Sequence, residues 1–345
     1  MGRLLALDVG AGTIDVLVWD EEERPENQVQ LILPSRTRLL ARAIRDAGPT
    51  TSVFLWGHQM GGGPITRAAR AHLEAGGTLV ATPQAAKTFH NDLERVRSWG
   101  IEVRADAPPG SLKLRTGDLD LTALAAALER LGVPLPGEVA VAVQDHGSQP
   151  GMSNRDVRFE HYRRWVSGGG RLQEMVYRVP PRQFTRMRAI QLQVPGAWVM
   201  DTAIAACWGA LCDSRVFRAS EAEGALVVNL GNAHLSAFLV RSMRVVGILE
   251  HHRTALRPGQ VKDLLERFRR RELSPAEVKE AGGHGVCYAP DYEGTEGGFT
   301  FWAVVGPWRR MLDGHGVLQA APYGNMMVAG CLGLVAASRG ALLRD

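Results

Sequence analysis

Cysteine is scarce in this sequence, and long uninterrupted apolar runs are missing. The four cysteines, at positions 207, 212, 287 and 331, form no Cys-x-x-Cys pair and show no metal-ligand spacing, which excludes a cysteine-built metal site of the common patterns. The most apolar windows, 194–211 and 326–337, are short or interrupted by polar residues, and nothing at the N-terminus resembles a secretory signal. We therefore expect a cytoplasmic protein with no membrane span.

Aromatic residues are also few, at 6% of the 345 residues, while 45% are apolar and 22% are charged. This composition is ordinary for a folded protein and too apolar for disorder. At this length, two lobes of about 150 residues each are the default expectation. The net charge of +4 is carried almost entirely by dispersed arginines, which does not favour a nucleic acid partner. The denser stretch at 155–188 is either a solvated face or a contact for an anionic substrate or partner.

The pattern of strands predicts a repeated unit. The β-type run at 4–8, the glycine turn at 9–13 and the second run at 14–19 predict a β-hairpin, and 225–240 repeats this order. A strand at 138–143 leads into Gln144 and Asp145, and we expect it to end the first lobe. The polar region that follows shows no long periodicity. The predicted division is therefore a first lobe at 1–147, a connecting or inserted segment at 148–194, and a second lobe at 195–345.

The first hairpin carries residues suited to a phosphate group. Gly10 and Gly12 let main-chain N–H groups approach an anion, and the hydroxyl of Thr13 can donate a hydrogen bond to it. Asp8 ends the first strand with a carboxylate, the type of ligand that Mg²⁺ prefers. Glycine-turned hairpins are common, however, and one such hairpin alone is more often a structural turn than a phosphate site.

The second hairpin has the same plan. Asn229 ends its first strand, and Gly231 and Asn232 form its polar turn. Two hairpins of one design, about 220 residues apart, indicate duplicated lobes that face one another across a cleft. His251 and His252 follow this hairpin, and because adjacent strand residues point to opposite faces, at most one of them can face the cleft.

These elements resemble, in order, those of the actin-like ATPase superfamily, which includes Hsp70, sugar kinases and acetate kinase. The five segments that match its two phosphate hairpins, connecting strand, adenosine strand-turn and connecting helix are 4–19, 138–147, 225–240, 299–311 and 323–337. The resemblance implies a two-lobed α/β fold of duplicated ribonuclease H-like domains, with ATP and Mg²⁺ in the cleft between the lobes. It further implies that Gly306 and Arg309 seat the nucleoside and that Asp8 holds the metal.

Two further segments resemble those of sugar kinases. The stretch Trp56-Gly57-His58-Gln59-Met60-Gly61-Gly62 is similar to their substrate loop, which implies that His58 and Gln59 contact a substrate. The alanine-rich segment 200–210 is similar to the helix that opens with their catalytic aspartate, which implies that Asp201 is a general base. Asp201 could equally cap the helix N-terminus.

Gln144 and Asp145 are the rival catalytic residues, because ATP-hydrolysing members of the superfamily orient the attacking water near this place. Asn229 departs from the acid that usually begins the second hairpin. The missing charge weakens the expectation of hydrolysis and of tight Mg²⁺ binding.

The overall pattern also resembles a prokaryotic family labelled pyruvate formate-lyase activating protein. We do not adopt that activity, because a radical-SAM activase needs a cysteine triad for its iron–sulfur cluster. Three functions remain open at this point. They are an ATP-dependent phosphotransferase acting on a small metabolite, an ATP-gated switch that drives a partner protein, and a scaffold that kept the fold and lost the chemistry.

Overall fold

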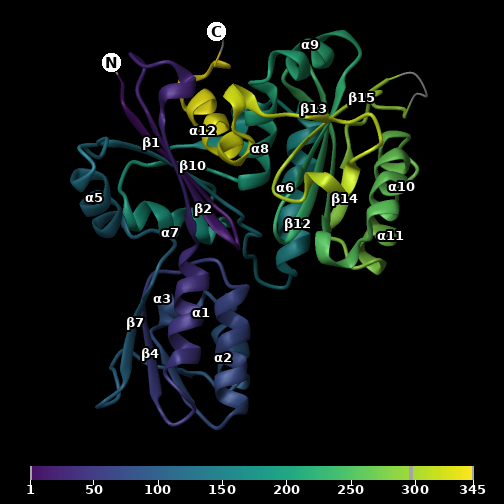
Figure 1. Cartoon of the computed structure of the whole chain (residues 1–345). Helices are drawn as coiled ribbons and strands as arrows, with labels where there is room; N and C mark the ends of the chain where they lie inside the picture. Colours follow the sequence, from purple (N-terminus) through teal and green to yellow (C-terminus); the bar gives the residue numbers. More distant parts are fainter. Residues whose placement is uncertain (1, 295–297, 344–345) are drawn as a thin grey trace.

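The computed structural model describes residues 2–294 and 298–343 and contains two six-stranded sheets of matching design (Figure 1). The first sheet has the order β3-β2-β1-β8-β10-β9, and the second has the order β14-β13-β12-β11-β15-β16. In each, a three-stranded antiparallel meander is extended by two strands that run parallel to its first strand. This repeated order, with one added edge strand per sheet, is the duplicated ribonuclease H-like arrangement of actin-like proteins, and it confirms the predicted fold.

The strands of the first sheet are β1 (Leu4–Val9), β2 (Thr13–Trp19), β3 (Val29–Pro34), β8 (Glu138–Val143), β9 (Val176–Tyr177) and β10 (Trp198–Met200). The strands of the second sheet are β11 (Ala225–Leu230), β12 (His234–Arg241), β13 (Arg244–His252), β14 (Gly285–Tyr288), β15 (Phe301–Val305) and β16 (Leu318–Gln319). The central strands β1, β8 and β11 are apolar runs buried on both faces, as expected where helices cover a sheet from both sides.

A third sheet forms a separate module within the first lobe. Its parallel strands, in the order β6-β5-β4-β7, are β4 (Ser52–Gly57), β5 (Thr78–Ala81), β6 (Glu102–Val103) and β7 (Leu112–Thr116). With α1 (Arg36–Asp46), α2 (Pro64–Glu74), α3 (Pro83–Ala86) and α4 (Leu93–Ser98) it encloses its own apolar core. The module projects at the bottom of Figure 1. The predicted first lobe at 1–147 includes these residues, but no pattern in the sequence predicts that they form a sheet of their own.

The remaining helices are α5 (Leu121–Arg130), α6 (Asn154–Ser167), α7 (Thr185–Gln193), α8 (Thr202–Leu211), α9 (Ser214–Ala222), α10 (Pro258–Arg269), α11 (Pro275–Glu280) and α12 (Ala329–Arg339). None of the helices within the described ranges is long and apolar enough to span a bilayer.

The segment 148–194 touches both sheets. Its helix α6 packs against β13 and β14 of the second sheet, whereas α7 packs against β8 and β10 of the first. Strand β10 also belongs to the first sheet, so by sheet membership the second lobe begins after residue 200. The division at 147 and 194 remains a proposal, and α6, for which the sequence showed no clear periodicity, buries an arginine among its apolar residues.

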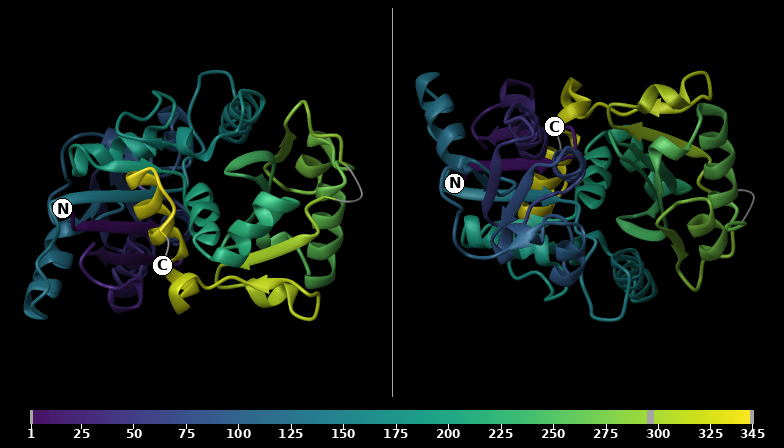
Figure 2. Two further views of the ribbon diagram at one scale, coloured as in Figure 1. Left: turned by 90° about the horizontal axis from the view of Figure 1, so that it is seen from above. Right: turned by 90° about the horizontal axis from the view of Figure 1, so that it is seen from below.

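Helices α8 and α12 cross between the two sheets (Figure 2, where α12 is yellow). α12 contacts β1, β2 and β8, while α8 contacts β11 and β15. Their backbones meet at two glycines: a methyl group at Gly209 would lie 1.8 Å from the carbonyl oxygen of Ala329, and one at Gly333 would lie 1.9 Å from that of Ala205. The close crossing of α8 and α12 between the two sheets therefore requires glycine at both positions.

We expect Gly209→Ala to lower the free energy of unfolding by about 1–3 kcal/mol, because the added methyl forces the two helices apart. Gly259→Ala is the matched control. Gly259 lies in α10 with nothing within 4 Å of its added methyl, so alanine should stabilise that helix by about 0.5–1 kcal/mol. Urea unfolding of both variants measures the difference, and equal effects would contradict the close helix crossing.

Candidate functional site

A cavity of about 360 Å³ lies where the two hairpins meet the end of β8. Its wall includes residues 9–11 of the first hairpin, residues 231–234 of the second, and residues 144–147 that follow β8. Residues 59–63 close a further side. They belong to the module of the first lobe that is built on the third sheet, called the inserted module below. Segments separated by more than two hundred residues thus enclose one polar space between the lobes.

The predicted site residues divide into two groups. Those that line the cavity are Gly10, Gln59, Gln144, Asp145, Asn229, Gly231 and Asn232. Those that lie outside its lining are Asp8, Gly12, Thr13, His58, Asp201, Gly306 and Arg309.

Three residues outside the lining have structural contacts. Gly12 lies at the junction of the hairpins, where a methyl group would come within 2.6 Å of the Asn232 amide nitrogen. Gly306 has φ of +100° and packs against the carbonyl of Leu230, 2.5 Å from its added methyl. Arg309 Nε donates to Gln319 Oε1 over 3.0 Å. The nucleoside role of Gly306 and Arg309 remains a prediction.

Asp8 is partly buried and lies outside the lining of the cavity. Its Oδ1 accepts a hydrogen bond from the Thr202 hydroxyl over 2.5 Å, and its Oδ2 lies against the main chain of Gly330. Burial, and then the charge of Asp15, raise the pKa of Asp8 to about 8, so the protonated form is favoured at neutral pH. In this arrangement Asp8 does not reach the cavity directly but holds Thr202, which does.

A buried ion network joins the two lobes beside the cavity. The guanidinium of Arg158 in α6 forms two hydrogen bonds to Asp201, of 2.5 and 2.9 Å, and donates from Nε to Glu250 Oε2 over 2.7 Å. All three side chains are at most 3% exposed. Arg158 also donates to the carbonyl of Asp145, and Gln144 Nε2 donates to Glu250 Oε1. The network therefore connects the end of β8, the start of α8 and strand β13.

The contacts of Asp201 are those of a helix cap and an ion pair. Its Oδ1 accepts from the amide of Ala203, at the start of α8, over 3.0 Å. Its carboxylate faces Arg158 rather than the cavity. The assignment of Asp201 as general base remains a prediction, and it requires this ion pair to open.

Asp145 is the only acidic side chain among the described residues that line the cavity. Its two oxygens accept hydrogen bonds of 2.8–2.9 Å from the amides of Gly147, Arg186 and Met187. Asp145 therefore anchors the start of α7, and this arrangement leaves the cavity without an uncommitted carboxylate. The guanidinium of Arg186, in α7, in turn forms a bidentate ion pair with Asp118, with two hydrogen bonds of 2.8 Å.

Four histidines gather beside the cavity, and the sequence analysis did not predict this cluster. His146 follows β8, His234 begins β12, His252 ends β13, and His284 precedes β14. The ring centroids of neighbouring members lie 4.6–5.0 Å apart. Burial lowers the pKa of His146 well below its ordinary value, that of His234 to about 3 and that of His252 to about 4. These three rings are therefore neutral at neutral pH.

Part of the cluster follows from strand pairing. His234 lies opposite His252 in the β12–β13 register, and Ser236 lies opposite Glu250, so these four side chains share one face of the second sheet. His251 points to the other face, in line with the expectation that at most one of the pair faces the cleft. His146 and His284 come from different segments, and no pattern in the sequence brings them together.

We expect Arg158→Met to lower the free energy of unfolding by about 3–5 kcal/mol, because it leaves two buried carboxylates without their partner. Burial alone would raise the pKa of Glu250, but Arg158 and then His284 hold it well below its ordinary value of 4.5. The stability that Glu250 contributes is present above that value and is lost as the pH falls through its lower folded-state pKa. The difference between wild type and variant should therefore narrow in acid.

Urea unfolding at neutral and acidic pH measures this effect. Arg163→Met is the matched control, since Arg163 lies on the same helix, is half exposed and pairs with the surface carboxylate of Glu160. That variant should change stability by less than about 0.5 kcal/mol. Equal losses in the two variants would show that Arg158 does not hold the lobes together.

Comparison with known proteins gives one family match. Residues 60–311 match the family model described as "Putative pyruvate format-lyase activating enzyme (DUF1786)". No curated protein matches the chain.

We describe two of the solved structures that are similar to the chain. One is ethanolamine utilization protein EutJ from Carboxydothermus hydrogenoformans, at 12% identity over 97% of this chain and 89% of that chain, with a TM-score of 0.36. The other is a ROK family glucokinase from Streptomyces griseus, solved with glucose and AMPPNP, at 14% identity over 71% of this chain and 46% of that chain, with a TM-score of 0.23. At these scores neither structure adds to the argument from strand order.

The family match covers well over half of the 345 residues, and the two sheets repeat one strand order. The chain therefore belongs to the DUF1786 family and has the fold of the actin-like ATPase superfamily.

Proposed function

We propose that this protein binds ATP with Mg²⁺ in the cavity between its lobes and uses the bound nucleotide as a switch that acts on a partner protein. The observation that carries the proposal is the meeting of both glycine hairpins at one polar cavity. A phosphate tail in this place would contact both lobes at once. Its binding or loss would then change how the lobes sit against each other.

The two hairpin turns have matching geometry. The amide of Gly10 donates to the carbonyl of Thr13 over 2.9 Å, and that of Gly231 donates to the carbonyl of His234 over the same distance. Within the described part of the chain, the next amides, of residues 11, 12, 232 and 233, donate no hydrogen bond. Unpaired amides in a tight turn form a concave anion site, which supports phosphate binding from both sides.

The lining also suits Mg²⁺ that keeps its water shell. Mg²⁺ prefers oxygen ligands and retains several waters when it binds with phosphates. Asn229 and Thr202 line the cavity and offer an amide and a hydroxyl oxygen to such waters. Bound Mg²⁺ would neutralise charge on the phosphates. Asp8 would act behind Thr202, by holding the hydroxyl in place.

The distribution of carboxylates favours a switch with slow hydrolysis over rapid phosphoryl transfer. Asp145 and Asp201 are both committed to structural contacts. Gln144 lines the cavity and can orient an attacking water, the task that a glutamine performs in other nucleotide switches. Its Nε2 donates to Glu250 of the other lobe. A change at the terminal phosphate would therefore reach the interlobe network through one side chain.

A phosphotransferase is the second candidate, and the inserted module favours it. Gln59 and Asn91 line the cavity and lie within 3.3 Å of each other through their amide groups. Such groups suit a small hydroxyl-bearing metabolite. In this case Asp201 would have to leave Arg158 to act as base, and ADP release would rise when the metabolite is added.

We expect Ala11→Asp to weaken ATP binding at least about tenfold, because it places a negative charge beside the phosphates. Ala11 is exposed and lines the cavity, so the fold should tolerate the change. Ala11→Asn is the matched control, with the same shape and no charge. Calorimetric titration with Mg²⁺ and ATP measures the three dissociation constants.

Equal ATP binding by the Asp and Asn variants would place the phosphates elsewhere. If the wild type shows neither binding nor a thermal shift with ATP, ADP or GTP, the protein is a scaffold without nucleotide chemistry. A saturating ligand at a hundred times its dissociation constant should otherwise stabilise the fold by about 2.7 kcal/mol.

We expect Gln144→Ala to slow ATP hydrolysis at least about tenfold, since the variant cannot orient the attacking water. Gln149→Ala, at an exposed position five residues later, is the control and should hydrolyse ATP at the wild-type rate. The readout is ADP release under single-turnover conditions. A wild-type rate in Gln144→Ala would remove this residue from the mechanism.

A further inference from the structure

We propose that His146, His234 and His284 bind a divalent first-row transition-metal ion between the two lobes. The proposal is independent of ATP binding, since the residues that carry it belong to the histidine cluster. It assigns the cluster a chemical role that the nucleotide cavity alone does not require.

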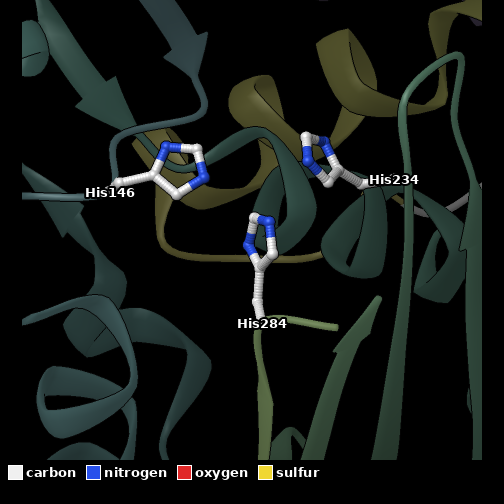
Figure 3. Close-up of side chains that lie close together, drawn as sticks. All are labelled: His146, His234 and His284. Atoms are coloured by element: carbon white, nitrogen blue, oxygen red, sulfur yellow. The ribbon is translucent and has the colours of Figure 1, made fainter. Parts of the chain in front are cut away.

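The three side chains converge from separate elements. Figure 3 shows the rings of His146, His234 and His284 turned toward one shared space. One ring nitrogen from each lies within 4.8 Å of the others. Tetrahedral coordination at about 2.0–2.1 Å would place these nitrogens roughly 3.4 Å apart. Rotations of the three rings can supply the remaining approach.

His284 is the least satisfied member of the cluster. It is 1% exposed, and its Nδ1 has no hydrogen-bond partner within the described residues. Glu250 Oε1 lies 3.6 Å from this atom, slightly too far for a hydrogen bond. A metal-bound histidine commonly donates its other ring N–H to a carboxylate. Glu250 is placed to accept this bond when the ring turns toward a metal.

The other nitrogen of His284 faces a second acceptor. His284 Nε2 lies 3.2 Å from His252 Nε2, which in turn lies 3.1 Å from an Arg155 guanidinium nitrogen. Arginine only donates, so His252 Nε2 presents its lone pair to Arg155. If Nδ1 of His284 carries the ring hydrogen, its Nε2 has a lone pair that faces the lone pair of His252 Nε2 at 3.2 Å, and the two lone pairs repel. A metal ion bound to His284 Nε2 would remove this repulsion. The competing explanation is a proton that the two Nε2 atoms share.

The surrounding charge also favours a cation. The single guanidinium of Arg158 faces the two buried carboxylates of Asp201 and Glu250, which leaves a net charge of one negative unit beside the histidine cluster. Arg155 is the opposing positive charge, and it lies on the exposed side of His252. His252 is therefore a neighbour of the proposed site and not one of its ligands.

The ligand set indicates the class of metal. Three imidazoles with an open fourth position suit Zn²⁺, and imidazole nitrogen also suits the other late first-row ions. His146 and His234 both line the cavity, so the fourth position would face it and take a water or a phosphate oxygen. His146 follows a strand of the first sheet, while His234 begins strand β12 of the second sheet and His284 precedes its strand β14. Bound metal would therefore link the two lobes.

The test is a titration of chelator-treated full-length protein with Zn²⁺, without nucleotide, followed by calorimetry and thermal unfolding. We expect one ion per chain and a rise in the unfolding temperature, because the ion binds the folded state alone. Co²⁺ should give the visible absorption of a four-coordinate nitrogen site. Binding that is absent for both ions would overturn the proposal and leave the shared proton as the explanation.

Variants separate this site from other binding on the surface. His146→Ala and His234→Ala should each weaken Zn²⁺ binding at least about a hundredfold, as loss of one of three ligands requires. Both residues are partly exposed, and urea unfolding without metal checks that each variant folds. If either does not, His146→Gln or His234→Gln, which keep more of the side-chain volume, replace it. His315→Ala, at an exposed position outside the cluster, should bind as wild type.

Wild-type affinity in His146→Ala and His234→Ala would contradict the assignment, as would an equal loss in His315→Ala. Because no nucleotide is present, this result stands apart from the outcome of the ATP titrations.

Discussion

The buried guanidinium of Arg158 is the interaction on which the arrangement of the lobes depends. This guanidinium is buried and donates hydrogen bonds to Asp201 at the start of α8, to Glu250 on β13 and to the carbonyl of Asp145 after β8. A buried charge is costly unless it is paired and hydrogen-bonded, so these three elements must stay close together whenever Arg158 is buried. The same geometry holds the carboxylate of Asp201 in its ion pair with Arg158. It also places Gln144 and His146 at the edge of the cavity.

Close backbone contacts set the remaining dimensions of the site. Gly209 and Gly333 let α8 and α12 cross in contact between the sheets, and Gly12 lets the first hairpin touch Asn232 of the second. These approaches bring two similar turns to opposite sides of one small cavity. Duplication of the lobes thus places two similar turns on both sides of the proposed nucleotide site. Within the described residues the four-stranded module belongs to the first lobe alone, so the side of the cavity that residues 59–63 close has no counterpart from the second lobe.

Among the described residues, the side chains that are grouped closely enough to hold a metal ion are histidines and not cysteines. All four cysteines are buried and unpaired, and burial raises the pKa of each thiol. Among the described residues, the one group of three possible ligands is the histidine set. These buried cysteines therefore give no support to the activity that the description of the matching family names. The proposed switch and the proposed metal both concern how the two lobes are held together.

The sequence by itself determined the strands, the glycine turns and their order along the chain. These follow from local alternation and from the small size of Gly10 and Gly231, where an added methyl group would lie 3.2–3.3 Å from the carbonyl oxygen that closes each turn. They were sufficient to predict duplicated lobes and three of the segments that line the cavity, and the resemblance to actin-like proteins supplied the ribonuclease H-like fold. Only the tertiary structure decided that Asp201 faces Arg158, that Asp8 lies behind Thr202, and that His146 and His284 meet. The reason is physical: the burial and partners of a charged or titratable side chain depend on elements far away in sequence, which no local pattern records.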